Sequence, residues 1–340
     1  MGDHVGNSKT VSTIIEKTNI CVSIHDRLTD EQRDFLKGAK NSQKEKGLEV
    51  ETTLADLNPS NPTDIIKLKT VISSICMIRD KTTRNDVATG FLANSLNIGT
   101  VFCSAGHNFK HILGSGGIEE LDRYIIHFGN IEGNIITDAD VVSPPMKGKP
   151  MMLRDFLCMF QFYGSISHRG KRKTFRKTSS SWDVTDEINT DAEEDYCALK
   201  LIHSDIVGEL KKLGLDRLDL GTGNYLDYNR KGLATIVGHP GGNATETTSD
   251  GAKIKPLRYS FGKEKAARPR SDNKLHFEYD SLGGNSGSPI IGRGYKDSSN
   301  SVDQAYKVKG IHIQGNKTGN LAYNCAQKIT RLGEWIQYGI

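Results

Sequence analysis

The stretch Gly283–Pro289, which reads GGNSGSP, combines a nucleophile with a turn that can bind an oxyanion. Glycine adopts backbone angles that are closed to other residues. The N–H groups of Gly284 and Ser286 can therefore converge where negative charge develops on a carbonyl oxygen under attack. In this interpretation Ser286 is the attacking group. A serine hydroxyl is a poor nucleophile until a histidine accepts its proton and an acid orients that histidine, so the turn predicts both partners elsewhere in the chain.

Candidates for both partners lie upstream of this turn. His107 ends the β-prone run VFCSAGH at residues 101–107, and Asp195 opens the apolar run DYCALKL at residues 195–201. The second run is typical of a buried strand. We expect His107 to be the general base and Asp195 to hold it in the productive tautomer. Weaker alternatives for the acid are Asp138, Asp140, Asp183, Asp186 and Asp191, none of which opens an apolar run of this length.

The order of His107, Asp195 and Ser286, with these flanking sequences, resembles the trypsin-like serine proteases of the chymotrypsin fold. The resemblance covers residues 69–340, and it is strongest to the glutamyl endopeptidase type and to intracellular trypsin-like proteases. Those proteases carry a GNSGSP-like serine loop and a downstream GIHxxG-like strand, which here reads GIHIQG. The resemblance implies a serine endopeptidase that works through a His-Asp-Ser triad and an acyl-enzyme, with Gly284 and Ser286 as the oxyanion hole.

The fold that the resemblance implies is all-β, a chymotrypsin-like double β-barrel with a C-terminal helix. The sequence pattern agrees, because short β-prone runs alternate with glycine-rich turns. The expected strands are residues 71–78, 87–92, 99–104, 124–128, 197–202, 234–238, 275–279 and 307–313. Helical spacing over residues 325–338 predicts the C-terminal helix.

The chain divides into an N-terminal extension, residues 1–68, and a protease-like domain, residues 69–340. We expect the extension to be partly helical and to end in the turn-rich NPSNP segment. Within the domain, residues 168–194 form a charged surface insertion that is basic in its first half and acidic in its second. We interpret it as a solvated insertion with a flexible hinge at residues 178–181, in preference to a nuclear-import or nucleic-acid-binding patch.

Two cues to the cleaved residue conflict. In the resembling proteases a histidine at the place of His312 lines the primary specificity pocket, where Ser281 could add a second hydrogen bond to a Glu or Gln side chain. Asp280 instead matches the position at which trypsin binds Arg or Lys. His312 could also be a structural strand residue with a polar neighbour. We expect cleavage after Glu or Gln, and cleavage after Arg or Lys is the alternative.

Composition is that of an ordinary globular protein, with 36% hydrophobic and 25% charged residues in 340. A net charge of +4 is too small to argue for a nucleic-acid partner. No apolar run approaches the roughly 20 residues of a membrane helix, and the first residues lack the pattern of a secretory signal. The expected partner is a protein or peptide substrate, with no membrane and no nucleic acid.

The six cysteines form no CxxC pair and predict reduced, buried thiols. Asn108 follows His107 where secreted relatives often carry a cysteine, so we expect an intracellular protein, cytoplasmic or nuclear. Neither a metal nor an organic cofactor is expected, because no CxxC or HExxH spacing occurs. Two other functions stay open: a non-catalytic interaction protein on a protease fold, and an esterase with the same triad.

Overall fold

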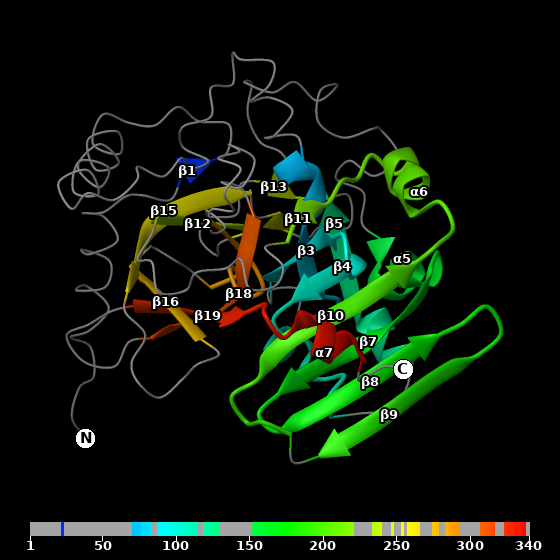
Figure 1. Ribbon diagram of the computed structural model, residues 1–340. Coiled ribbons are helices and arrows are strands. Elements are labelled where there is room, and N and C mark those ends of the chain that lie inside the picture. The colour runs from blue at the N-terminus through cyan, green and yellow to red at the C-terminus, as the bar shows by residue number, and fades with distance from the viewer. Residues whose placement is uncertain are drawn as a thin grey trace.

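The stretches that the computed structural model describes are residues 22–23, 70–82, 87–114, 118–128, 151–188, 190–220, 233–239, 246–247, 253–254, 257–265, 274–278, 283–292, 307–316 and 323–337. They form two large, mostly antiparallel sheets with a few short helices (Figure 1). The figure shows one sheet on the left, made from the second half of the chain, and the other on the right.

The left-hand sheet closes into a barrel. Its strands are β12 (Leu233–Gly238), β15 (Arg258–Lys265), β16 (Lys274–Glu278), β17 (Pro289–Gly292), β18 (Lys307–Asn316) and β19 (Tyr323–Lys328). They are hydrogen-bonded in the order β15-β12-β17-β18-β19-β16, and a pairing of β16 with β15 completes the ring. The short β1 (Val22–Ser23) adds to β15 from outside the ring. Closure satisfies the strand edges that an open sheet leaves exposed.

The right-hand sheet has the strand order β6-β5-β2-β3-β4-β10-β7-β8-β9. Its strands are β2 (Ile75–Asp80), β3 (Val87–Ser95), β4 (Gly99–Ser104), β5 (Tyr124–Phe128), β6 (Met151–Met152), β7 (Gln161–His168), β8 (Lys171–Lys177), β9 (Trp182–Ile188) and β10 (Asp195–Ile202). β11 (Leu218–Asp219) pairs with β3, and β13 (Glu246–Thr247) pairs with β14 (Lys253–Ile254) in a separate ribbon. The strands β2 and β4 are almost wholly buried, as their apolar sequences predict.

The helices are short. They are η2 (Gly106–Phe109), η3 (Ile118–Arg123), α5 (Leu153–Cys158), α6 (Ile206–Lys212) and α7 (Leu332–Gln337). The C-terminal α7 packs beside β7 and β10, where Trp335 stacks on Tyr196 with ring centroids 4.0 Å apart. The carbonyl of Trp335 also accepts a hydrogen bond from Ser165 Oγ at 2.7 Å. Because six residues are too few for a stable isolated helix, these tertiary contacts hold it in place.

The structure confirms the predicted all-β class, the chymotrypsin-like two-sheet arrangement and the C-terminal helix. The helix is shorter than its spacing suggested, since residues 323–328 form β19 between β16 and β18 and close the barrel. The expected strand at residues 71–78 begins only at Ile75, after a helical turn. Apart from Val22–Ser23, the N-terminal extension lies outside the described residues, so its boundary and its helix stay predictions.

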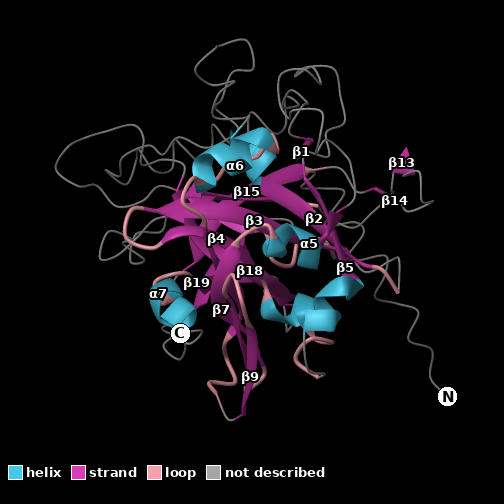
Figure 2. Cartoon of the chain, turned by 90° about the vertical axis from the view of Figure 1, so that its right-hand side faces the viewer, coloured by secondary structure: helices cyan, strands magenta, loops and turns pink. Residues whose placement is uncertain are grey.

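The charged insertion is an ordered hairpin. β8 and β9 extend the sheet in register and project from the body of the molecule (Figure 2). At the expected hinge, residues 178–181, the chain forms a hydrogen-bonded turn: the N–H of Thr178 donates to the carbonyl of Ser181 at 3.1 Å, and Thr178 Oγ1 accepts from the N–H of Ser181 at 3.0 Å. Hydroxyl-to-backbone bonds of this kind fix tight turns.

The opposite charges of the insertion pair across the two strands. Arg172 lies opposite Glu187, and its Nη2 atom is 2.6 Å from Oε2 of that residue. Lys173 lies opposite Asp186, with 3.1 Å between Nζ and Oδ1, and the lysine side chain is buried. The change from a basic to an acidic run is therefore the sequence pattern of a hairpin that neutralises its own charges.

No helix among the described residues is both long and apolar enough to cross a membrane.

Candidate active site

Antiparallel pairing brings His107 and Asp195 together. β4 runs directly into η2, which carries His107, and β10 pairs with β4 so that its first residue, Asp195, lies beside the start of η2. Gly106 makes the approach possible, because a Cβ atom there would lie 1.9 Å from the carbonyl oxygen of Ser167. The glycine directly before His107 is thus a packing requirement.

Asp195 holds His107 with two hydrogen bonds. The backbone N–H of His107 donates to Oδ1 at 2.8 Å, and its ring Nδ1 lies 2.8 Å from Oδ2. Because the carboxylate accepts the Nδ1 proton, the lone pair of the neutral ring is on Nε2. This is the tautomer that a general base requires.

A second histidine contacts the same carboxylate. His168 ends β7 directly opposite Asp195, and its Nδ1 atom is 3.5 Å from Oδ1. Burial on its own would raise the pKa of Asp195, but hydrogen bonds from His107 and His168 outweigh it and hold that pKa below its ordinary value. Asp195 is therefore ionised at any pH at which the protein would work.

The serine turn is fastened to the sheet that carries His107. The N–H of Thr89, in β3, donates to the carbonyl of Ser286 at 2.9 Å, and Thr89 Oγ1 donates to the carbonyl of Gly284 at 2.9 Å. The side chain of Asn108, next to the histidine, donates to the same Ser286 carbonyl at 3.0 Å. These bonds set Ser286 at the junction of the two sheets, beside η2.

The barrel holds the other side of the turn. The N–H of Gly287 donates to the carbonyl of His312 at 2.7 Å, and the N–H of His312 donates to the carbonyl of Ser288 at 2.8 Å. Gly284 and Gly287 have φ values of 101° and 90°, which only glycine adopts without strain. The sequence GGNSGSP therefore has its glycines where the backbone requires them.

The backbone N–H groups of Gly284 and Ser286 are the predicted oxyanion donors in this turn. The carbonyl of Asn285 accepts from the N–H of Ser288 at 2.9 Å. Because a trans peptide group is planar, the N–H of Ser286 then points the opposite way. Neither that N–H nor the N–H of Gly284 donates to the backbone of another described residue. Ser286 itself is partly exposed, so a substrate can reach it.

His312 is 2% exposed. Its backbone is hydrogen-bonded to Gly287 and Ser288, the two residues that follow Ser286. Burial, with a smaller contribution from the neighbouring His107, lowers the pKa of His312 to about 3, so the ring is neutral at neutral pH. The other two predicted pocket residues, Asp280 and Ser281, lie outside the described residues.

The alternative acids do not join the site where they are described. Asp183 and Asp186 lie on β9 opposite Arg176 and Lys173, and Asp191 caps a turn by accepting from the N–H of Glu193 at 2.9 Å. Asp138 and Asp140 lie outside the described residues.

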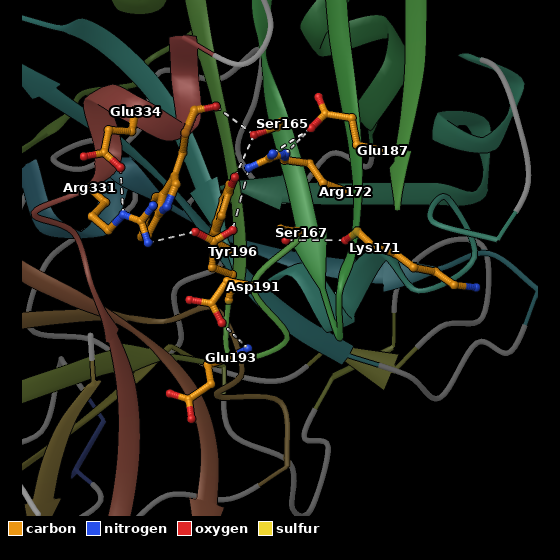
Figure 3. Close-up of polar contacts among 12 residues, drawn as sticks. Ser165, Ser167, Lys171, Arg172, Glu187, Asp191, Glu193, Tyr196, Arg331 and Glu334 are labelled. Atoms are coloured by element: carbon orange, nitrogen blue, oxygen red, sulfur yellow. Dashed lines mark hydrogen bonds and ion pairs between the residues drawn. The ribbon is translucent and has the colours of Figure 1, made fainter. Parts of the chain in front are cut away.

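Polar contacts of the two residues that flank Asp195 in the sequence link them to β7, to β8 and to the turn before α7; Figure 3 shows polar contacts in this region. Glu194 is 3% exposed and lies 3.2 Å from Arg331, the residue before α7, and 3.9 Å from Arg172 in β8. Burial raises the pKa of Glu194, and the two guanidinium groups counter that effect. On the far side of Asp195, the hydroxyl of Tyr196 lies 2.9 Å from Ser165 Oγ. The residues on both sides of Asp195 are therefore fixed.

Sequence reasoning missed three contributors to the site: Thr89, Asn108 and His168. Thr89 lies in the run ATGFL at residues 88–92, and a polar residue inside a buried strand is the signal that could have identified it. Asn108 was noted only for not being cysteine. No local pattern identifies His168, because its contact with Asp195 depends on the pairing of β7 with β10.

The described cysteines are free thiols. Cys76, Cys103, Cys197 and Cys325 are buried, and burial raises the pKa of each, to about 11 for Cys325. Such thiols stay protonated and unreactive. Cys158 is exposed, contrary to the expectation of buried cysteines, because it ends the surface helix α5.

No protein-family model matches the chain, and no curated protein matches it. Among solved structures, it is similar to an inactivated protease paralogue of the scabies mite, with 12% identity, a TM-score of 0.44 and coverage of 79% of this chain and 95% of that one. It is also similar to the active form of the M. tuberculosis protease Rv3671c, with 12% identity, a TM-score of 0.41 and coverage of 84% of this chain and 90% of that one.

Proposed function

We propose that the protein is a serine endopeptidase with His107, Asp195 and Ser286 as its catalytic triad. The observation that carries the proposal is the pair of 2.8 Å hydrogen bonds between Asp195 and His107, next to a turn that presents a partly exposed Ser286. A buried, ionised carboxylate that fixes a histidine tautomer has little structural purpose on its own, whereas a general base requires it.

The proposed reaction follows the roles of these groups. The Oγ atom of Ser286 attacks the peptide carbonyl while His107 Nε2 accepts the hydroxyl proton. The N–H groups of Gly284 and Ser286 bind the oxyanion that forms. His107 then gives the proton to the leaving amine, which departs and leaves an acyl-enzyme on Ser286. Water, activated by His107, hydrolyses the ester and restores the serine.

The direct test is labelling and turnover of the purified chain. A fluorophosphonate probe should label the parent on Ser286, and Ser286→Ala and His107→Ala should each abolish peptide hydrolysis, because triad members act as a unit. Hydrolysis of simple esters but not of peptides would favour the esterase. A parent protein that the probe does not label would favour the non-catalytic interaction protein.

The assignment of the acid has its own test. Asp195→Asn keeps the size of the side chain but presents an amide to His107, which stabilises the wrong tautomer, so turnover should fall by about four orders of magnitude. Rate measurements on protein with a parent-like circular dichroism spectrum isolate this effect. A near-parental rate would give the role to another carboxylate.

For specificity we propose that His312 lines the primary pocket and that cleavage follows Glu or Gln. In support, His312 is bonded through its backbone to Gly287 and Ser288, next to Ser286, and its ring is neutral. A polar group in a pocket that an apolar substrate leaves unpaired costs about 1–3 kcal/mol, so we expect a preference of roughly tenfold or more for Glu or Gln over Leu.

A cleavage profile on a mixed peptide library separates this proposal from its alternative. His312→Ala should reduce the preference for Glu and Gln, and Asp280→Ala should leave it intact. A strong preference for Arg or Lys that only Asp280→Ala removes would assign the pocket to the carboxylate.

We further propose an intracellular location and a protein or peptide partner, with neither membrane nor nucleic acid. The free thiols support a reducing compartment, and the charge pairing in the β8–β9 hairpin leaves its basic run matched by acids of the same chain. Fractionation of cells that express a tagged chain tests the location, and a nucleic-acid shift assay tests the partner.

A further inference from the structure

Three ligand-type side chains of the site form a cluster that the proposed reaction does not use as a whole. One donor atom each of His107, His168 and Asp195 lie within 4.8 Å of one another. Both histidines approach the carboxylate through Nδ1, at 2.8 Å from Oδ2 and 3.5 Å from Oδ1, and their rings are 5.8 Å apart. A reaction that needs one histidine and one acid does not account for the second imidazole on the same carboxylate.

The spacing matches that of a transition-metal site. Bonds of about 2.0–2.1 Å to nitrogen and oxygen in a tetrahedral zinc site put neighbouring ligand atoms about 3.3 Å apart. The observed 2.8 and 3.5 Å, measured to the two different carboxylate oxygens, lie on either side of that distance. All three donor atoms lie within 4.8 Å of one another, so the ligands would have to draw together by at most about 1.5 Å. Two imidazoles and one carboxylate also form a donor set that zinc accepts, with a fourth position for water.

The cluster is fixed in place and open to solvent. Asp195 and His168 are directly opposite each other in the β10–β7 pairing, and His107 is held by its backbone bond to Asp195, so the ligands need no large rearrangement. The side chains of His107 and His168 are 28% and 21% exposed, which gives a hydrated ion a route to them. A site that is both pre-formed and accessible binds without the cost of ordering its ligands.

We propose that His107, His168 and Asp195 form a binding site for a divalent transition-metal ion of the zinc type, and that the bound ion switches the protease off. Binding itself is independent of the proposed function, whereas the inhibition rests on it. Imidazole ligands favour zinc over magnesium or calcium, which prefer sites made of oxygen alone.

Inhibition follows because the metal binds Nδ1 of His107. The ion forms bonds to Nδ1 of His107, to Nδ1 of His168 and to a carboxylate oxygen of Asp195, and it displaces the hydrogen bond between His107 and Asp195. The Nδ1 proton of His107 moves through water to Nε2, so no proton is lost from the ring. A ring with N–H at Nε2 has no lone pair there and cannot accept the proton of Ser286.

Calorimetric titration of full-length Ser286→Ala with zinc chloride tests binding without any need for activity. We expect one zinc ion per chain and no heat from magnesium chloride. His168→Gln and, separately, Asp195→Asn in this background should each weaken binding by about tenfold or more. The matched control His203→Gln removes an exposed histidine outside the cluster and should bind like the starting protein.

Inhibition is measured on the parent chain. Zinc should reduce turnover reversibly, with recovery on addition of a chelator, and in His168→Gln about ten times more zinc should be needed to halve that variant's own zinc-free rate. Absence of zinc binding, or affinity unchanged in His168→Gln protein with a parent-like circular dichroism spectrum, would overturn the proposal. Zinc binding in a chain that hydrolyses no substrate would leave the site intact and remove the proposed function.

Discussion

Thr89 holds the serine turn through both its backbone and its hydroxyl. Its N–H donates to the carbonyl of Ser286, and its Oγ1 donates to the carbonyl of Gly284 while accepting from the N–H of His239 at 3.0 Å. The residue is fully buried, so no water can replace these bonds. The orientation of the serine turn, with the proposed oxyanion donors, therefore depends on a side chain outside the proposed triad.

Thr89→Val removes the hydroxyl and keeps the shape of the side chain. The buried carbonyl of Gly284 loses its donor, at a cost of about 1–3 kcal/mol, so turnover should fall by about tenfold to a hundredfold with KM changed less. Thr89→Ser, which restores a hydroxyl, should recover much of the rate. Steady-state kinetics on all three proteins check this, and equal rates for parent and Thr89→Val would contradict it.

His312 gives stability a pH dependence of known sign. Its pKa is about 3 in the folded chain against an ordinary value of 6.5, so between these values the unfolded chain binds a proton that the folded chain does not. The free energy of unfolding therefore falls as pH falls through that window, by up to about 1.4 kcal/mol per pH unit. His107 and Asp195 are the charged groups that also influence this ring.

Urea denaturation of parent and His312→Gln from pH 7 to pH 4 measures that contribution, and the variant should lose less stability on acidification. Asp195 acts at lower pH: its folded pKa is below 3.8, so its stabilisation is present above that value and is lost only as pH falls further. Parallel curves for the two proteins between pH 7 and pH 4 would show that His312 does not titrate as argued.

At the scale of elements, the β8–β9 hairpin supports the strand that carries Asp195. Arg172 of β8 contacts Glu187 across the hairpin and Glu194, the residue before Asp195, and its side chain is 11% exposed. Removing one partner of a buried charge leaves the other uncompensated. The hairpin thus contributes to the free energy of unfolding of the site.

Arg172→Leu should lower the free energy of unfolding by about 3 kcal/mol, because Glu194 stays buried with one cation fewer. The matched control is Arg176→Leu on the same strand, an exposed position opposite Asp183, where the change should stay within about 0.5 kcal/mol. Urea denaturation compares the two variants. Equal losses would mean that Arg172 acts as an ordinary surface charge.

Sequence patterns predicted strands where apolar side chains fill successive positions, as in residues 99–104, and they predicted His107, Asp195 and Ser286 from local motifs. They failed at β8, where KRKTFRK resembles a charged loop. The segment forms a strand because the acidic strand β9 pairs with it and neutralises its cations. Long-range pairing also decides the contact of His168 with Asp195 and the strand at residues 323–328. Such pairings depend on which strands become neighbours in the folded sheet, and a short stretch of sequence does not carry that information.

At the scale of the whole molecule, both sheets hydrogen-bond to the serine turn, one through Thr89 and the other through His312. Trypsin-type zymogens instead complete this turn when a newly cut N-terminal amine pairs with an aspartate before the serine. Here that position is the buried Asn285, whose neutral amide offers an ammonium no opposite charge.

Full-length protein with a blocked N-terminus should therefore hydrolyse substrate without a lag. A progress curve recorded beside chain-length analysis by mass spectrometry checks this, with protein trimmed of residues 1–68 as the comparison. A lag that ends only as the extension is cut would mean that the turn, although bonded on both sides, needs the new terminus to become competent.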